Sequence, residues 1–238
     1  MLRILLPPGY RLVRFATLHY SVLYLNDGQN LFDACTPAPN HEQWRVEETM
    51  AALMASGDIP PMIVVGIDNA GRMRAHEYLA YPDDTLQLAD PSPQGKLYPQ
   101  FLLQEVVPFI ERRYRVRPGA ANRVLGGASY GAGAALYTLI ARPDSFYGLL
   151  LESPSVYASD YALLKEAEKV QQWPRRIFIG TGTVREPVED VHKLESLFQK
   201  AGLDDHRLRV VIQQGGKHSE TWWGKRLPDA LGFLFAIR

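Results

Sequence analysis

The chain has 238 residues, 46% of them hydrophobic, and its 26 basic and 26 acidic side chains give a formal net charge of zero. This length and apolar content predict a single domain over residues 1–238 with a sizeable core. The charge balance excludes the strongly basic field typical of proteins that bind nucleic acid or anionic lipid. The single cysteine, Cys35, excludes an intrachain disulfide and a cysteine-rich metal site.

The start of the chain does not look like a targeting segment. Its apolar run is too short for a signal peptide and is not followed by a small-residue cleavage site. No stretch approaches the about 20 apolar residues that a membrane-spanning helix needs. We therefore expect a cytoplasmic protein that binds neither nucleic acid nor membrane.

Hydrophobic patterning predicts strands that alternate with helices along most of the chain. The expected strands cover residues 2–6, 12–16, 20–25, 62–67, 123–125, 147–151, 176–180 and 208–212. The expected helices cover residues 44–56, 97–114, 132–141, 158–172, 188–201 and 221–237, with a kink at Pro108. Residues 68–95 show little periodicity and are expected to form a long functional loop. The alternation predicts a three-layer α/β domain with a mostly parallel sheet, in which chemistry gathers at the carboxyl ends of the strands.

A G-x-S-x-G motif, Gly127-Ala128-Ser129-Tyr130-Gly131, lies between an expected strand and an expected helix. This context is the one that a nucleophile elbow requires, because a sharp strand-to-helix turn exposes the serine hydroxyl and leaves room only for glycine on either side. The alternative is a glycine-rich turn whose serine caps the helix. We favour the elbow, with Ser129 as a nucleophile.

A serine nucleophile needs a base, and His218 is the best placed of the six histidines. It follows the last expected strand in a glycine-flanked loop, where the order Ser, Asp/Glu, His puts the base. The other five lie in a helix, at the amino end of the sheet, or before Ser129 in the sequence: His19, His41, His76, His192 and His206.

Three carboxylates compete for the place of the triad acid. Glu186 follows the strand 176–180 and is favoured, Glu152 at the end of the preceding strand is its main rival, and Asp190 is third. The oxyanion also needs two backbone donors. One is the N–H of Tyr130, and the second is expected from Gly28-Gln29, although Asp27-Gly28 can equally be read as a simple turn.

Taken together, these residues resemble the esterase D-like family of α/β-hydrolases, and most closely its short members similar to siderophore (enterochelin-type) esterases. The resemblance extends along nearly the whole chain. It is carried by residues 6–10, 23–32, 44–49, 66–69, 77–78, 127–131, 153–155 and 215–220, with Trp222 and Trp223.

The resemblance implies an α/β-hydrolase fold, Ser129 as nucleophile, His218 as base, and the N–H groups of Gln29 and Tyr130 as the oxyanion hole. It also supports Glu186 as the acid. Two features depart from the family pattern. The elbow continues with Gly131-Ala132 in place of two glycines, and the acid loop carries an extra residue, Val184 or Arg185, so a Ser–His dyad stays an alternative.

The sequence therefore predicts a serine carboxylic-ester hydrolase that acts through an acyl-enzyme on a small or aryl ester. Trp44, Tyr78, Tyr130 and Trp222 are candidate walls of the substrate pocket, with ordinary packing as the alternative. No metal or organic cofactor is expected. An acyltransferase on the same scaffold, a peptidase or amidase, and a non-catalytic binding protein are the alternatives. The chain is expected to be a monomer or a homodimer.

Overall fold

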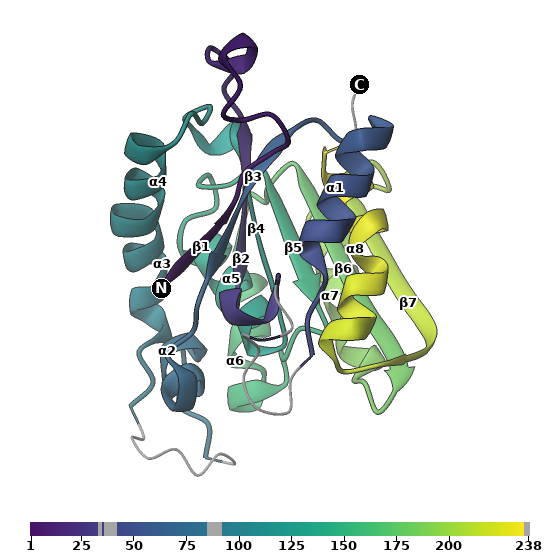
Figure 1. Cartoon of the computed structure of the whole chain (residues 1–238). Helices are drawn as coiled ribbons and strands as arrows, with labels where there is room; N and C mark the ends of the chain where they lie inside the picture. Colours follow the sequence, from purple (N-terminus) through teal and green to yellow (C-terminus); the bar gives the residue numbers. More distant parts are fainter. Residues whose placement is uncertain (33–34, 36–41, 85–91, 236–238) are drawn as a thin grey trace.

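The computed structural model describes residues 1–32, 35, 42–84 and 92–235 and contains one seven-stranded sheet (Figure 1). The strand order is β1-β3-β2-β4-β5-β6-β7. The strands are β1 (Leu2–Leu5), β2 (Ser21–Asn26), β3 (Met62–Ile67), β4 (Arg123–Ala128), β5 (Gly148–Glu152), β6 (Arg176–Val184) and β7 (Leu208–Lys217). Neighbouring strands from β3 to β7 pair in parallel, and β1 alone pairs antiparallel, against β3. The prediction of a mostly parallel sheet is confirmed.

Helices cover both faces of this sheet (Figure 1). They are α1 (Val46–Ser56), α2 (Arg74–Tyr78), α3 (Tyr98–Phe101), α4 (Val107–Arg113), α5 (Tyr130–Ala141), α6 (Ala158–Ala167), α7 (Val188–Lys200) and α8 (Glu220–Phe235). Helices α1 and α8 pack on one face, while α3 to α7 contribute to the core on the other. This arrangement has the three layers that the alternation of strands and helices predicts.

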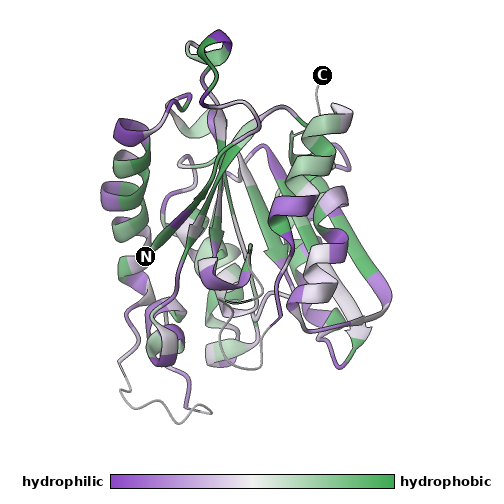
Figure 2. Ribbon diagram, in the orientation of Figure 1, coloured by the Kyte–Doolittle hydropathy of each residue, from purple (hydrophilic) through white to green (hydrophobic). Residues whose placement is uncertain are grey.

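The central strands show why both faces need cover. Along β2, Val22 and Tyr24 belong to the core under α3–α7, whereas Leu23 and Leu25 belong to the core under α1 and α8. All four side chains are almost completely buried. Because successive side chains of a strand point to opposite faces, a continuous apolar run is what a sheet buried on both sides requires. Figure 2 shows green along the central strands, whereas the helices around them alternate between purple, white and green.

Several expected boundaries differ from the structure. Residues 12–16 do not form a strand but a short 3₁₀ turn, Val13–Phe15, in which Val13 is 90% exposed. The strand prediction was wrong because this apolar run does not pack into the sheet. Residues 97–114 are helical but are interrupted by a π-helical turn, Leu102–Val106, just before Pro108, which cannot donate a backbone hydrogen bond. The helix expected over 158–172 ends at Ala167.

The last two strands are longer than predicted. Strand β6 extends to Val184 and β7 to Lys217, so part of each expected glycine loop is paired strand. A β-carbon on Gly182 would lie 2.2 Å from the carbonyl oxygen of Gly216. The two backbones are therefore so close at this point that residue 182 has to be glycine. The expected loop 68–95 contains helix α2, and its residues 85–91 lie outside the described part of the chain. In the described residues, no helix is both long and apolar enough to cross a bilayer.

Candidate active site

Ser129 occupies the turn between β4 and α5 in a backbone conformation that non-glycine residues rarely adopt, with φ 55° and ψ −125°. A β-carbon on Gly127 would lie 2.7 Å from the backbone of Gly131, and one on Gly131 would lie 2.7 Å from Asp27 Oδ2. Both glycines of the motif are therefore required by the close approach of neighbouring atoms. The predicted succession of strand, sharp turn and helix is present.

The hydroxyl of Ser129 hydrogen-bonds to a second serine. Its Oγ lies 3.2 Å from Ser155 Oγ, in the segment after β5, and either oxygen can be the donor. Ser155 is almost completely buried, whereas Ser129 is half-buried and lines a cavity of about 370 Å³. His218 lines the same cavity, while the Ser129 hydroxyl is hydrogen-bonded to Ser155. Catalytic hydrogen bonds often form only when substrate is bound.

His218 lies beyond β7 and contacts the favoured acid. Its Nδ1 is 3.0 Å from Glu186 Oε2. The side chain of Glu186 has no exposed surface, while that of His218 is 40% exposed. Since a carboxylate can only accept, Nδ1 carries a proton, and in the neutral imidazole the lone pair then lies on Nε2. The second carboxylate oxygen, Oε1, accepts a hydrogen bond of 2.8 Å from Ser153 Oγ.

The two rival carboxylates have other partners. Glu152 is completely buried and accepts two hydrogen bonds from Arg226, at 2.9 and 2.6 Å. Burial raises the pKa of Glu152 to about 7; Arg226 opposes this shift and the charge of Glu186 adds to it. Asp190 accepts hydrogen bonds from Tyr161 on α6 and from Lys193 on α7. Of the three candidates, Glu186 is the one that contacts His218.

Four of the other five histidines lie in the described part of the chain, each in another segment. His192 bonds to Glu195 on α7, and His19 bonds to its own segment. His76 lies on α2, and His206 lies in the turn before β7. His41 lies outside the described residues.

The segment that follows β2 contains the expected second donor, Gln29, in a 3₁₀ turn, Gly28–Asn30. Asp27 precedes this turn with φ 58° and is only 5% exposed. Its carboxylate accepts two hydrogen bonds from Arg74 on α2, at 2.7 and 2.8 Å, and one of 2.6 Å from Asn69 Nδ2. The N–H of Asn69 in turn donates to Gln29 Oε1 at 3.2 Å. The turn is thus attached to the segment after β3.

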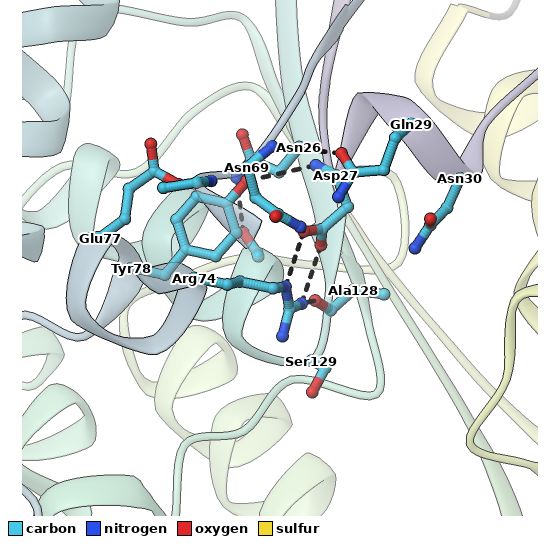
Figure 3. A network of polar contacts seen from close by, with 12 residues as sticks. Asn26, Asp27, Gln29, Asn30, Asn69, Arg74, Glu77, Tyr78, Ala128 and Ser129 are labelled. Carbon is cyan, nitrogen blue, oxygen red and sulfur yellow. Dashed lines mark hydrogen bonds and ion pairs between the residues drawn. The ribbon is translucent and has the colours of Figure 1, made fainter. Parts of the chain in front are cut away.

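Arg74 also contacts the elbow. Its Nη2 donates to the carbonyl oxygen of Ala128 at 3.4 Å, and Figure 3 shows the guanidinium between Asp27 and Ala128, beside Ser129. Burial opposes the charge of Arg74, but the neighbouring carboxylate of Asp27 outweighs it and raises the pKa of the guanidinium. A permanent cation therefore joins the 27–30 turn to the strand that carries the serine.

The cavity wall differs from the expected one. Trp44 lines the cavity, and its ring lies 5.6 Å from that of Trp223, which lines it too. Trp222 is not among the described lining residues; instead, Lys225 stacks on its ring. Tyr78 is buried, accepts a hydrogen bond from the N–H of Asp27, and lines a separate small cavity that Tyr130 also borders. Within the described ranges, no cluster of three metal-ligating side chains is present.

The sequence analysis assigned no role in this site to Arg74, Ser153, Ser155 or Trp223. Ser153 carried a usable signal, because a polar residue directly after a buried strand is expected at the edge where Ser129 lies. Trp223 was part of the family resemblance, and helical spacing alone could not tell which of two adjacent tryptophans faces the cavity. Arg74 had no local signal within an aperiodic segment.

A serine on a strand–turn–helix elbow and a histidine after the last strand, both at the carboxyl edge of a parallel sheet, define a protein of the α/β-hydrolase class. A model of the family described as "Putative esterase" matches residues 1–234. The chain belongs to this family and is a carboxylic-ester hydrolase.

Named relatives and solved structures agree with this placement. Ferri-bacillibactin esterase BesA of Bacillus subtilis (strain 168) is 25% identical over 213 residues, which cover 82% of this chain and 69% of that protein. A solved ferulic acid esterase aligns at 19% identity with a TM-score of 0.73, over 98% of this chain and 91% of that one. The enterochelin esterase of Shigella flexneri aligns at 20% identity with a TM-score of 0.73, over 98% of this chain and 54% of that one. The two structures share the fold.

Proposed function

We propose that Ser129, His218 and Glu186 form the catalytic triad of this ester hydrolase. The observation that carries the proposal is the shared cavity, into which the strained serine turn opens together with a histidine already hydrogen-bonded to a buried carboxylate. Strain and a buried carboxylate are costly, and both are commonly retained at functional sites.

In the proposed reaction, the Ser129 hydroxyl leaves Ser155 and hydrogen-bonds to Nε2 of His218. His218 takes the proton as Ser129 Oγ bonds to the ester carbonyl carbon, and Glu186 stabilises the imidazolium that forms. The tetrahedral intermediate collapses, the alcohol leaves with the proton from His218, and the acyl group stays on Ser129. Water, activated by His218 in the same way, then releases the acid.

The oxyanion is held by the N–H groups of Gln29 and Tyr130 in this proposal. Tyr130 is the first residue of α5, where N–H groups have no acceptor within the helix and the helix dipole favours negative charge. The Arg74–Asp27 pair supports the arrangement, because it ties the turn that carries Gln29 to the strand that leads to Ser129. Fixed donors of this kind are worth about 10²–10³-fold in rate each.

We propose a small or aryl ester as the substrate. Trp44 and Trp223 give the cavity two aromatic walls that suit a planar ring, and the named relatives include feruloyl and siderophore esterases. Turnover of short aliphatic esters far faster than aryl-acyl esters would contradict the aryl preference. A cytoplasmic location, and a monomer or homodimer, stay predictions.

The deciding experiment is intact-mass labelling with a fluorophosphonate, on wild type, Ser129→Ala and His218→Ala. We expect one adduct on the wild type, none on Ser129→Ala, and labelling slowed by orders of magnitude on His218→Ala. No adduct on folded wild-type protein would refute the triad.

Hydrolysis assayed with and without an added alcohol or sugar distinguishes the esterase from an acyltransferase, which would transfer the acyl group in preference to releasing the acid.

A further inference from the structure

Ser153 is the first residue after β5 and is held in an unusual conformation. Its φ is 42°, in the left-handed region, and it is only 1% exposed. Its N–H donates to the carbonyl oxygen of Gly180 at 2.7 Å, so the backbone at this point is bonded to β6. Glycine is the residue that adopts such a conformation at little cost, and a buried serine there needs a reason in its side chain.

The hydroxyl of Ser153 makes two hydrogen bonds whose direction is fixed by chemistry. Trp223 Nε1 lies 3.0 Å from Ser153 Oγ, and an indole N–H can only donate. The single proton of Ser153 is therefore left for Glu186 Oε1, at 2.8 Å. The chain of donors runs from Trp223 to Ser153 to Glu186, whose Oε1 is the final acceptor.

Both oxygens of Glu186 are thus occupied, Oε1 by Ser153 and Oε2 by His218. Trp223 also contacts the base. Its ring packs edge-on against the imidazole of His218, with centroids 5.1 Å apart and an interplanar angle of 83°. Ser153 therefore contacts the acid, Glu186, while Trp223 contacts both Ser153 and the base, His218.

The route of the chain explains why Glu186 needs this support. Glu186 follows Val184, the last residue of β6, through Arg185, which has φ 57°, and a register irregularity lies between Gly182 and Val184. The carboxylate is carried by a loop rather than by a strand. The other hydrogen bond of the carboxylate is to His218, whose side chain is 40% exposed and so is less enclosed by neighbours than that of Glu186.

We propose that Ser153, together with Trp223, is a positioning group that holds Glu186 in the orientation required by His218; this rests on the proposed triad. Ser153 does not touch the substrate in this role. Its strained backbone is retained because it directs the hydroxyl at Glu186 Oε1.

The informative variant is Ser153→Gly. Glycine relieves the positive φ and removes the hydroxyl, so a merely structural serine would be replaced without loss, whereas a positioning serine would not. We expect kcat for 4-nitrophenyl acetate to fall about 10- to 100-fold, the effect of losing one hydrogen bond to a charged group, with KM unchanged. The urea midpoint, in which relief of the positive φ opposes the loss of two buried hydrogen bonds, shows that the variant is folded under the assay conditions. Trp223→Phe keeps an aromatic ring against His218 but removes the N–H donor, and we expect a smaller loss of kcat.

Ser159→Gly is the matched control for glycine itself. Ser159 also has a positive φ, 56°, but its hydroxyl donates to the carbonyl oxygen of Tyr81 and does not contact Glu186. We expect its kcat to stay within about twofold of wild type. A double-mutant cycle adds a second readout: in a Glu186→Ala background, Ser153→Gly should cost less than about twofold, because the group it positions is gone.

A wild-type kcat in Ser153→Gly, or an equal loss with and without Glu186, would overturn the positioning role. Fluorophosphonate labelling of the same proteins separates this failure from that of the triad. If wild type forms a His218-dependent adduct at Ser129 and Ser153→Gly labels at the same rate, the positioning role alone fails. If wild type forms no adduct, both proposals fail.

Discussion

Arg74 joins two segments of the site that lie far apart in the sequence, the turn after β2 and the end of β4. It donates to both oxygens of the Asp27 carboxylate, from Nε to Oδ1 and from Nη2 to Oδ2, which a lysine cannot do with this fixed geometry. Asp27 is nearly inaccessible, so its carboxylate depends on these hydrogen bonds in place of water. Ser129 and Gln29 follow β4 and β2, which pair directly. Asn26 Nδ2 also donates to the carbonyl oxygen of Gly131. Arg74 adds a charged link between the same two segments beyond the strand ends.

Arg74→Ala should therefore reduce both stability and rate. Asp27 would be left buried without its cation, and we expect the free energy of unfolding to fall by about 3 kcal/mol. We expect kcat to fall about 10- to 100-fold through displacement of the oxyanion donors. Urea unfolding and steady-state hydrolysis measure the two effects. Arg72→Ala, an exposed arginine two residues earlier, is the control and should change neither. An unaltered kcat in Arg74→Ala would exclude a role for the pair in holding the oxyanion turn.

Ser129 could be predicted from the sequence and Arg74 could not, because only Ser129 is marked by the residues next to it. Ser129 and His218 were predicted because each is marked by its immediate surroundings, a glycine-flanked turn or a loop after a strand. Arg74 and Ser153 act through contacts with Asp27 and Glu186, which only the assembled sheet brings near. Glu186 could be ranked but not separated from Glu152, because burial with Arg226 depends on α8.

Helix α8 packs against the segment before α1 through a close contact between two backbones. A β-carbon on Gly224 of α8 would lie 2.2 Å from the carbonyl oxygen of Trp44, just before α1. This approach lets Trp44 and Trp223 meet at the cavity. Element type was predictable because the periods of buried strands and amphipathic helices differ, whereas boundaries such as 12–16 and the ends of β6 and β7 depend on tertiary neighbours.

Gly224→Ala should force α8 away from the segment that carries Trp44. We expect a loss of about 1–3 kcal/mol in the free energy of unfolding, as for other overpacked contacts, with a shift in tryptophan fluorescence. Gly232→Ala is the matched control on the same helix, because nothing lies within 4 Å of its added β-carbon. Since alanine is the better helix former, that variant should gain up to about 1 kcal/mol. Equal stability of the two variants would show that α8 can shift without cost.

Three elements meet at the Glu152–Arg226 pair, which connects the end of β5 to α8 and, through Gln213, to β7. The pair is buried on both sides, at 0% and 3% exposure. Glu152 Oε1 also lacks a hydrogen-bond partner among the described residues, and a β-carbon on Gly180 would lie 2.5 Å from it. A carboxyl group this enclosed binds its proton more tightly than it does in the unfolded chain, so it couples the stability of the whole fold to pH.

The sign of this coupling is testable. Burial raises the pKa of Glu152 from 4.5 to about 7, so between these values the folded protein binds more protons than the unfolded chain. The contribution of Glu152 to stability is therefore fully present below about pH 4.5 and is lost as pH rises through about 7, with a slope of at most about 1.4 kcal/mol per pH unit.

Glu152→Gln removes the titration, so the difference in unfolding free energy between wild type and this variant should move against wild type from pH 5 to pH 8. Urea unfolding at each pH measures it, with Glu168→Gln, an exposed carboxylate, as the control for loss of one charge. A difference that stays constant with pH would show that Arg226 keeps Glu152 ionised throughout, and a difference that moves in favour of wild type would mean that Arg226 outweighs burial.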